Sequence, residues 1–365
     1  MNERERLMAV LEGRVPDRTP WFADMSYLYS GLELQGKLDS KYQGDEGYIR
    51  FHKDLGVGAF CYYPVSLWKT EYAADISYLV SEKDGYRIHE YATPLGKLRS
   101  MEKYLPNAYT WAYCEHFVKT IEDLRIMLYI FENSQYSEGF DYFNEIDALW
   151  GGDGMLAGIA PVSVSALQKL IARWAGLENT VDIVLSNREE FEEIILRIHN
   201  SEDSIFEILK RSPALYIEFP ENLSSEVTGK YFFEKYNAPY YQKRTSQLHA
   251  AGKYTGLHID GTLKPCLSML KSCGFDVAES VTPYPVGDVA PEGLREIAGS
   301  GITIWGGLPG ALFSRVYTDY QFDEHLKKVL DTFPLGSGFV LGVADQVPPD
   351  AVIDRVIRVR EQVER

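Results

Sequence analysis

One imidazole and two carboxylates occur in this sequence where they could act together. His258 and Asp260 lie in the segment YTGLHIDG that begins at Tyr254, and Asp345 follows much later in the segment GVADQ. Side chains two residues apart on a β-strand share a face, so we predict that His258 and Asp260 project side by side and that a late loop adds Asp345. Such a set of groups is suited to binding a divalent metal ion or to acid/base chemistry.

Further polar residues follow other strand-like segments. Glu221 and Asn222 come just after the run from Leu215 to Phe219, and Glu279 lies in the run from Phe275 to Val281. We therefore add Glu221 and Glu279 to His258 and Asp260 as candidate catalytic residues. The candidate substrate-binding residues are the polar and aromatic side chains Asn222, Tyr27, Tyr63, Trp305 and Gln346.

Each candidate also has an ordinary structural interpretation. A histidine near a strand end is more often a hydrogen-bonded structural residue than a ligand. Asp260 with Gly261 is typical of a turn, and Asp345 would also serve to cap the helix expected after Pro348. The recurrence of acidic or imidazole groups at successive predicted strand ends favours a functional site.

Length and composition exclude several classes of protein. The chain has 365 residues, 45% of them hydrophobic, which favours one large domain over several ordinary ones. The 37 Lys and Arg residues face 53 Asp and Glu, and no basic stripe is present, so nucleic acid is not an expected partner. The four cysteines form no CxxC pair, which favours reduced thiols and a cytoplasmic protein. No apolar run reaches the ~18 residues of a membrane span.

The order of the expected elements predicts the fold. From Met155 onward, strand-like and helix-like segments alternate, and one of these helices runs from Thr262 to Met269. This many βα units imply a parallel sheet closed into a (β/α)8 TIM barrel, and no GxGxxG or Walker motif supports a nucleotide-binding sheet. A helix is expected over residues 3–13, and another opens at Pro348-Pro349-Asp350.

A different pattern occurs between residues 70 and 100. Short β-like runs are separated there by Asp84-Gly85 and by Thr93-Pro94-Leu95-Gly96, which predicts a small antiparallel β-hairpin excursion. We therefore predict an α/β protein with one TIM-barrel domain over residues 1–365. The N-terminal extension and the hairpin region would cover 1–110, and the most regular βα units would cover 150–365.

At this point the chain resembles the uroporphyrinogen decarboxylase superfamily, and its methyltransferase-like branch more than the true decarboxylases. The matching segments span nearly the whole chain and are Arg4 to Leu7 with Pro16 to Pro20, Thr93 to Leu98, Lys119 to Leu124, His258 to Gly261, Gly274 to Asp276, Thr282-Pro283, Gly287-Asp288, Gly306-Gly307 and Asp345 to Pro349. The resemblance implies a (β/α)8 barrel with its pocket at the carboxyl ends of the strands.

The chain departs from the decarboxylases in one region. The true decarboxylases bear an arginine-rich N-terminal loop for the carboxylates of the porphyrinogen, whereas this sequence has no arginine between Arg18 and Arg50. A tetrapyrrole with several carboxylates needs cationic partners, so uroporphyrinogen is not the expected substrate.

The chain also departs from the methyltransferase branch, which holds zinc through His-x-Cys after a barrel strand and a Cys in the final loop. His258 is retained here, while Asp260 and Asp345 stand approximately where the two cysteines would be. Carboxylates with a histidine suit Zn, Mn or Fe(II) acting on oxygen better than a zinc that activates a thiol. We therefore predict His258, Asp260 and Asp345 as ligands of one divalent metal ion.

The resemblance implies an enzyme that moves a methyl group from an O- or N-methylated small molecule, such as a methoxyarene, to a corrinoid protein. The corrinoid would enter only through that partner protein, and a homodimer is expected because related barrels often form one. The alternative is a decarboxylase or lyase, cofactor-free or metal-dependent, that acts on a small carboxylic acid with His258 or Glu279 as the proton donor. A third hypothesis is a non-catalytic small-molecule binding protein.

Overall fold

Two compact units make up the chain in the computed structural model, which describes every residue from Met1 to Arg365. The barrel unit comprises Met1–Ser66, Phe140–Ala160 and Pro213–Arg365, and the insert unit comprises Leu67–Gly139 and Pro161–Ser212. Each unit is assembled from segments that are discontinuous in sequence.

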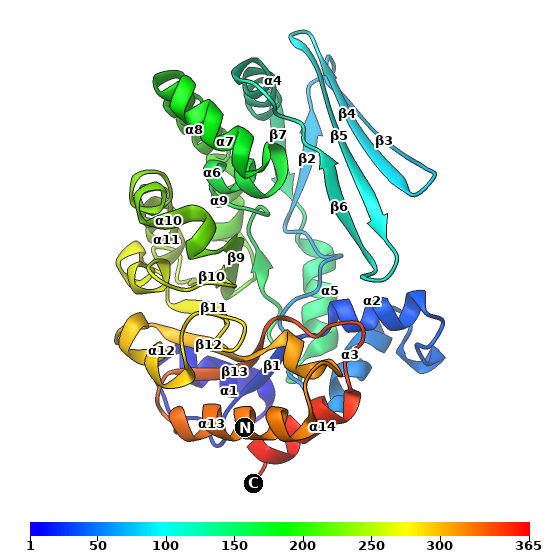
Figure 1. Ribbon diagram of the computed structural model, residues 1–365, viewed down its shortest axis with the longest axis vertical. Helices are drawn as coiled ribbons and strands as arrows, with labels where there is room; N and C mark the ends of the chain where they lie inside the picture. The colour runs from blue at the N-terminus through cyan, green and yellow to red at the C-terminus, as the bar shows by residue number, and fades with distance from the viewer. The chain divides into compact units, whose positions relative to one another are not determined.

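A parallel sheet forms the centre of the barrel unit (Figure 1). Its order is β1-β13-β12-β11-β10-β9-β8, and every neighbouring pair is parallel. The strands are β1 (Trp21–Asp24), β8 (Gly158–Ile159), β9 (Tyr216–Leu223), β10 (Tyr254–Ile259), β11 (Val277–Val281), β12 (Thr303–Pro309) and β13 (Phe339–Gln346).

The segment around Gly58 and Ala59 closes this sheet into a ring. Gly58 forms a parallel bridge with Phe22 of β1, and Ala59 forms one with Gly154, just ahead of β8. The backbone N–H of Met155 also donates to the carbonyl of Ala59 at 2.9 Å. The strands and this bridging segment confirm the predicted TIM-barrel fold.

Helices surround the sheet, as Figure 1 shows for α10 to α14. The α-helices of the barrel unit are α1 (Glu3–Leu11), α2 (Ser26–Leu34), α3 (Gly44–Leu55), α5 (Phe140–Trp150), α10 (Ser225–Phe232), α11 (Ala238–His249), α12 (Pro291–Ala298), α13 (Asp319–Thr332) and α14 (Ile353–Val363). The short 3-10 or π turns are η1 (Ser40–Tyr42), η3 (Phe233–Asn237), η4 (Cys266–Met269), η5 (Lys271–Cys273) and η6 (Gly310–Phe313). The expected N-terminal helix is confirmed as α1, and Asn2 caps it.

Two predicted helices differ from the structure. The helix expected from Thr262 to Met269 is wrong, because only the 3-10 turn η4 forms there. The backbone N–H groups of Leu263 and Lys264 instead donate to the carboxylate of Asp288 at 2.7 and 3.3 Å, and Pro265 has no N–H for a helical bond. The last helix begins at Ile353, after the proline pair that was expected to open it.

The barrel interior is filled by aromatic side chains. The ring of Trp305 lies 4.6 Å from that of Phe60, 5.6 Å from Phe22 and 5.9 Å from Tyr216, measured between centroids. Leu7 of α1 belongs to the same buried cluster. This packing is typical of a barrel whose interior is a core and whose chemistry lies at the carboxyl ends of the strands.

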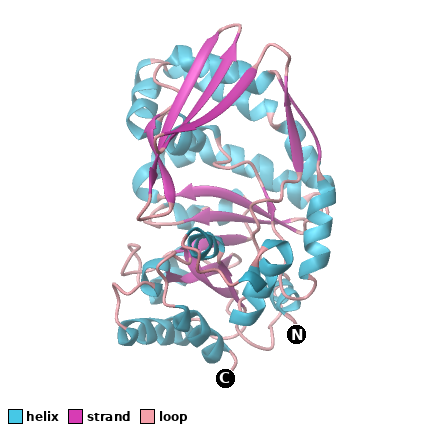
Figure 2. Ribbon diagram, turned by 90° about the vertical axis from the view of Figure 1, so that its right-hand side faces the viewer, coloured by secondary structure: helices cyan, strands magenta, loops and turns pink.

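The insert unit contains antiparallel strands and helices, and Figure 2 shows the long strands of its larger sheet. The strands are β3 (Ser77–Lys83), β4 (Tyr86–Thr93), β5 (Gly96–Leu105) and β6 (Thr110–Glu115) in one sheet, and β2 (Trp68–Tyr72) with β7 (Ser134–Glu138) in another. The helices are α4 (Ile121–Glu132), α6 (Ala166–Lys169), which continues into the π-helical η2 (Leu170–Trp174), α7 (Gly176–Ser186), α8 (Arg188–Ser201) and α9 (Asp203–Arg211).

The predicted β-hairpin is confirmed as β3 and β4. Asp84 and Gly85 connect the two strands with φ angles of 53° and 77°, the left-handed conformation that a tight hairpin turn requires. The run expected after Gly96 is confirmed as part of β5, and the excursion extends further than expected because β6 adds to the same sheet. Across both units, the helices all lack the combination of length and apolar character that a bilayer span demands.

Candidate active site

His258 and Glu279 form the centre of the site, on neighbouring parallel strands. The register of β10 and β11 pairs these two residues directly, so their side chains project from the same face of the sheet. Nδ1 of His258 lies 2.6 Å from Oε2 of Glu279, and both side chains are largely buried. The structure therefore brings together two residues that the sequence predicted as catalytic.

Asp345 approaches the same imidazole from the end of β13. Its Oδ1 atom lies 3.8 Å from Nε2 of His258, and its backbone N–H donates to the hydroxyl of Ser280 on β11. Asp345 and Ser280 have φ angles of 66° and 64°, which non-glycine residues seldom adopt. Backbone strain of this kind persists where the surrounding structure holds a functional group in place.

A third acid, Asp24, ends β1 beside β13. Its Oδ2 atom accepts hydrogen bonds from the hydroxyl of Tyr63 and from Nε2 of Gln346, both at 2.7 Å. Its Oδ1 atom accepts from the backbone N–H of Ser26 at 2.8 Å. Tyr63 and Gln346, both predicted to bind substrate, are thus held by a common carboxylate.

Glu218 adds a buried carboxyl group on β9. The hydroxyl of Tyr216, two residues earlier on the same face of the strand, donates to Oε2 of Glu218, and Oε1 has no hydrogen-bond partner. Burial, with the nearby charge of Glu279, raises the pKa of Glu218 well above its usual range. The environment of Glu218 therefore favours its neutral form more than solvent would.

His258 itself is held in its charged form. Burial disfavours the imidazolium, but the carboxylate of Glu279 outweighs burial and raises the pKa of His258 to about 10. The charges of Asp260 and Asp345 act in the same direction. Nδ1 is engaged by Glu279, whereas Nε2 is buried with no hydrogen-bond partner in the protein. An unpaired buried donor is costly, so this N–H is the natural point of contact for a substrate acceptor atom.

Asp345 is the most solvent-accessible of these acids, with 60% of its side-chain surface exposed. The surrounding protein still reduces its hydration, which raises the pKa of the Asp345 carboxyl to about 6. The positive charge of His258 acts in the opposite direction and lowers this pKa. The charges of Asp260 and Asp24 contribute to the increase. Asp345 therefore changes its charge close to neutral pH.

The predicted metal ligands are not assembled as a set. The structure contains no group of three or more His, Cys, Asp and Glu side chains that is arranged to hold a metal ion. Asp260 influences His258 through its charge but makes no side-chain hydrogen bond with it. The metal site at His258, Asp260 and Asp345 therefore stays a prediction, and the proposed reaction uses the side chains alone.

Two predicted site residues, Glu221 and Trp305, are buried among other side chains, and two more, Asn222 and Tyr27, can be placed only on their elements. Glu221 is fully buried and accepts a hydrogen bond from the hydroxyl of Tyr241 on α11, so it faces the surrounding helices. Asn222 is exposed at the end of β9, and Tyr27 lies in the first turn of α2. Trp305 is 1% exposed within the aromatic core and lines no surface that a substrate would reach.

Two acids of the site were missed by sequence reasoning. Asp24 follows the short apolar run Trp21-Phe22-Ala23, and the rule of polar residues at strand ends would have identified it had that run been assigned as a strand. Glu218 lies inside a buried strand, where a single acid among apolar residues is itself a signal of function or pairing.

Comparisons with known proteins agree with this architecture. A family model described as uroporphyrinogen decarboxylase (URO-D) matches residues 159–365, more than half of the chain. Among solved structures, a methyltransferase from Methanosarcina mazei is similar over 100% of both chains, with a TM-score of 0.60 and 13% sequence identity. At that identity the likeness concerns the fold alone. No curated protein matches the sequence.

Proposed function

Because the chain belongs to the uroporphyrinogen decarboxylase family, we propose that it is an enzyme that transfers a methyl group from an oxygen-methylated small molecule. The observation that carries this proposal is the imidazolium of His258, whose Nε2 proton is buried and has no partner in the protein. When the methyl group of a methyl ether is transferred, the rest of the molecule departs as an oxyanion. That oxyanion needs a proton.

A methoxyarene suits this acid better than an alkyl ether does. The leaving group of a methoxyarene is a phenolate, whose conjugate acid has a pKa of about 10, as in tyrosine. The pKa of His258 is raised above its ordinary value to about 10, so an imidazolium is present at neutral pH to protonate that oxygen. A general acid must hold its proton at the working pH, and a side chain positioned to give it up in the transition state contributes to the rate.

The proposed reaction divides the work among three side chains. The bond between the methyl carbon and the ether oxygen breaks, the methyl group passes to an acceptor nucleophile, and the oxygen takes the Nε2 proton of His258. Glu279 orients the imidazole through Nδ1 at 2.6 Å and stabilises its charge. Asp345, 3.8 Å from Nε2, is positioned to return a proton from solvent after the product leaves.

A corrinoid protein is the proposed acceptor, on the ground of the resemblance to the methyltransferase branch. A corrinoid, bound by that partner, would supply the nucleophile that receives the methyl group. A homodimer is proposed on the same ground.

The decarboxylase alternative is less well supported by the charges of the site. The carboxylates of Asp24, Glu279 and Asp345 have their hydrogen-bond and ion-pair partners among Tyr, Gln, Ser and His residues, and none among Arg or Lys. A carboxylate substrate would meet three like-charged carboxylates here with only the imidazolium of His258 to offset them, whereas a neutral ether would bring no negative charge into the site.

The direct test of the proposal is an assay of purified protein with cob(I)alamin and a panel of methoxyarenes. We expect release of the corresponding phenol, measured by chromatography, together with loss of the cob(I)alamin absorbance. Parallel reactions contain methylamines, or small carboxylic acids with detection of carbon dioxide. Carbon dioxide release without phenol formation would support the decarboxylase instead, and no turnover of any ether or amine would reject methyl transfer.

Metal analysis of the purified protein tests the predicted cofactor separately. If His258, Asp260 and Asp345 rearrange around an ion, the protein should contain about one equivalent of Zn, Mn or Fe, as one three-ligand site requires. The variants Asp260→Ala and Asp345→Ala should then lose that metal, while Asp323→Ala on the outer helix α13 should retain it. Metal-free wild-type protein that still releases phenol would eliminate the metal site.

A further inference from the structure

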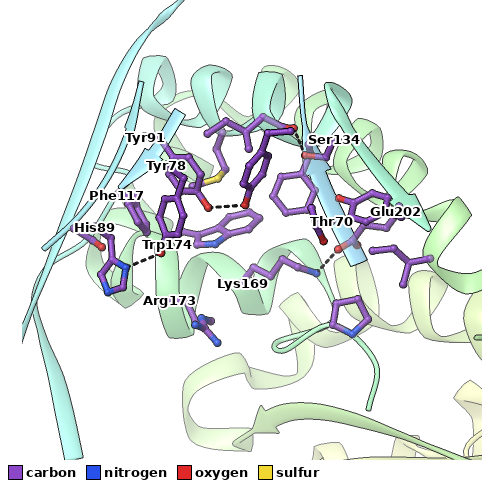
Figure 3. Close-up of a pocket in the computed structure, with 18 of the residues that line it drawn as sticks. Thr70, Tyr78, His89, Tyr91, Phe117, Ser134, Lys169, Arg173, Trp174 and Glu202 are labelled. Atoms are coloured by element: carbon purple, nitrogen blue, oxygen red, sulfur yellow. Dashed lines mark hydrogen bonds and ion pairs between the residues drawn. The ribbon is translucent and has the colours of Figure 1, made fainter. Parts of the chain in front are cut away.

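The insert unit encloses a cavity of about 410 Å³ that is separate from the residues around His258 (Figure 3). All of its lining residues belong to this unit, from both of its sequence segments. A cavity of roughly 150 Å³ is enough to hold one benzene ring, so this one has room for a ligand with two aromatic rings. It also falls within the ~300–1,000 Å³ range of small-molecule sites.

Aromatic rings form much of the cavity wall. Tyr78 and Tyr91 stack with their centroids 4.4 Å apart, and Phe117 lies 5.5 Å from Tyr91. On the helical side, Trp174 packs against Phe131 at 5.2 Å. Walls of this kind favour a flat aromatic ligand, which gains both burial and ring contacts.

The two carboxylates that line the cavity already have cationic or histidine partners. Glu202 forms a buried ion pair with Lys169, with a distance of 2.9 Å between Nζ and Oε1. Glu102 lies 3.2 Å from Nε2 of His89. Figure 3 shows the side chain of Lys169 directed toward Glu202 across the cavity. No free carboxylate is therefore available to attract a cationic ligand.

Arg173, by contrast, has no carboxylate partner. It lines the cavity four residues after Lys169 on the continuous α6 and η2 helix, and no acid lies within ion-pair distance of its guanidinium. Burial raises the pKa of Tyr91 and of Tyr113, while the charge of Arg173 acts against that rise, which places the guanidinium near these hydroxyls. The net charge available to a ligand is thus positive.

Three further features indicate a binding site. The hydroxyl of Ser100 lines the cavity, is fully buried and has no hydrogen-bond partner. Lys169 donates to Glu202 and to the carbonyl of Val164, which leaves one of its three N–H donors for a ligand. The π-helical turn that carries Arg173 is a rare conformation that occurs frequently at functional sites.

We propose that this cavity binds an aromatic carboxylate of about two rings, a size set by its volume relative to a benzene-sized cavity. The rings lie against Tyr78, Tyr91 and Trp174, and the carboxylate is held by Arg173 with help from the free N–H of Lys169. This site is distinct from that of His258 and does not depend on the reaction proposed there.

Isothermal titration calorimetry with 2-naphthoate tests the proposal. The neutral amide 2-naphthamide and the cation tetramethylammonium serve as matched probes. We expect 2-naphthoate to bind the wild-type protein at least tenfold more tightly than 2-naphthamide, and tetramethylammonium to show no binding. Absence of 2-naphthoate binding, or tighter binding of tetramethylammonium, would overturn the proposal.

The variant Arg173→Gln should weaken 2-naphthoate binding at least tenfold and leave 2-naphthamide binding unchanged. The matched control is Arg125→Gln, because Arg125 is an exposed arginine of the same unit that pairs with Glu190 on the surface. It should bind both probes as the wild type does. Equal affinity of Arg173→Gln and wild type for 2-naphthoate would reject the assigned role of the guanidinium.

The variant His258→Gln separates this site from the proposed active site. It should bind 2-naphthoate within twofold of the wild-type affinity. Loss of binding in His258→Gln would show that the ligand occupies the barrel site, and the second site would then be rejected even if methyl transfer were confirmed.

Discussion

Replacing His258 by glutamine should lower the rate of phenol release from a methoxyarene by about 10²–10⁴-fold, the range that general acid catalysis usually contributes. Gln can still donate a hydrogen bond to Glu279, but its amide cannot give up a proton to the departing oxygen. The expected loss is therefore in kcat, with the substrate KM little changed, because the proton is transferred only as the bond breaks. Steady-state kinetics of purified wild type and His258→Gln would measure both.

His249→Gln is the matched control for that substitution. His249 ends α11 in the barrel unit and pairs with Asp276 at 2.8 Å, at the amino-terminal side of the strands and away from the proposed chemistry. Its variant should retain activity within twofold. If His258→Gln also retained full activity while its fold remained intact, His258 would not be the proton donor.

The second large effect is expected for Glu279→Gln. The carboxylate of Glu279 is what keeps the buried imidazole protonated, so its removal should bring the pKa of His258 well below its present value of about 10. Because the reaction needs the imidazolium, we expect the kcat of the wild type to stay level through neutral pH and to fall as the pH rises through about 10. In Glu279→Gln the same fall in kcat should occur at lower pH. Nitrogen NMR of the imidazole and the pH dependence of kcat would both measure the change.

Glu279→Gln should also destabilise the fold, by up to about 3–5 kcal/mol if the imidazolium remains charged and unpaired. Deprotonation of His258 would reduce that cost, because a buried group without a partner neutralises instead. Urea denaturation at pH 7 measures the change in the free energy of unfolding. The control is Glu292→Gln, because Glu292 is an exposed acid on α12. We expect the control to stay within about 0.5 kcal/mol of wild type. An unchanged pKa of His258 in Glu279→Gln would contradict the assigned role.

Local sequence patterns determined the elements of this protein and one part of its site. Alternating strand-like and helix-like segments predicted the parallel barrel, and Asp84-Gly85 predicted the hairpin. His258 and Glu279 could be selected because each lies on its own strand near the carboxyl end. These patterns involve residues close together in the chain, so a single sequence is enough to detect them. The helix expected from Thr262 failed because Asp288, distant in the chain, holds that segment in another conformation.

Only the tertiary structure decided which groups act on one another. Asp24 and Glu218 join the site because β1 and β9 take their places in the ring, and that pairing depends on contacts between segments far apart in the chain. Glu221 contacts Tyr241 of α11 because the pleat of β9 turns its side chain away from that of Glu218. The cavity of the insert unit likewise needs two segments separated by barrel residues. Local propensity specifies strands and helices, whereas the sheet register and the burial that set the charge of His258 are properties of the folded chain.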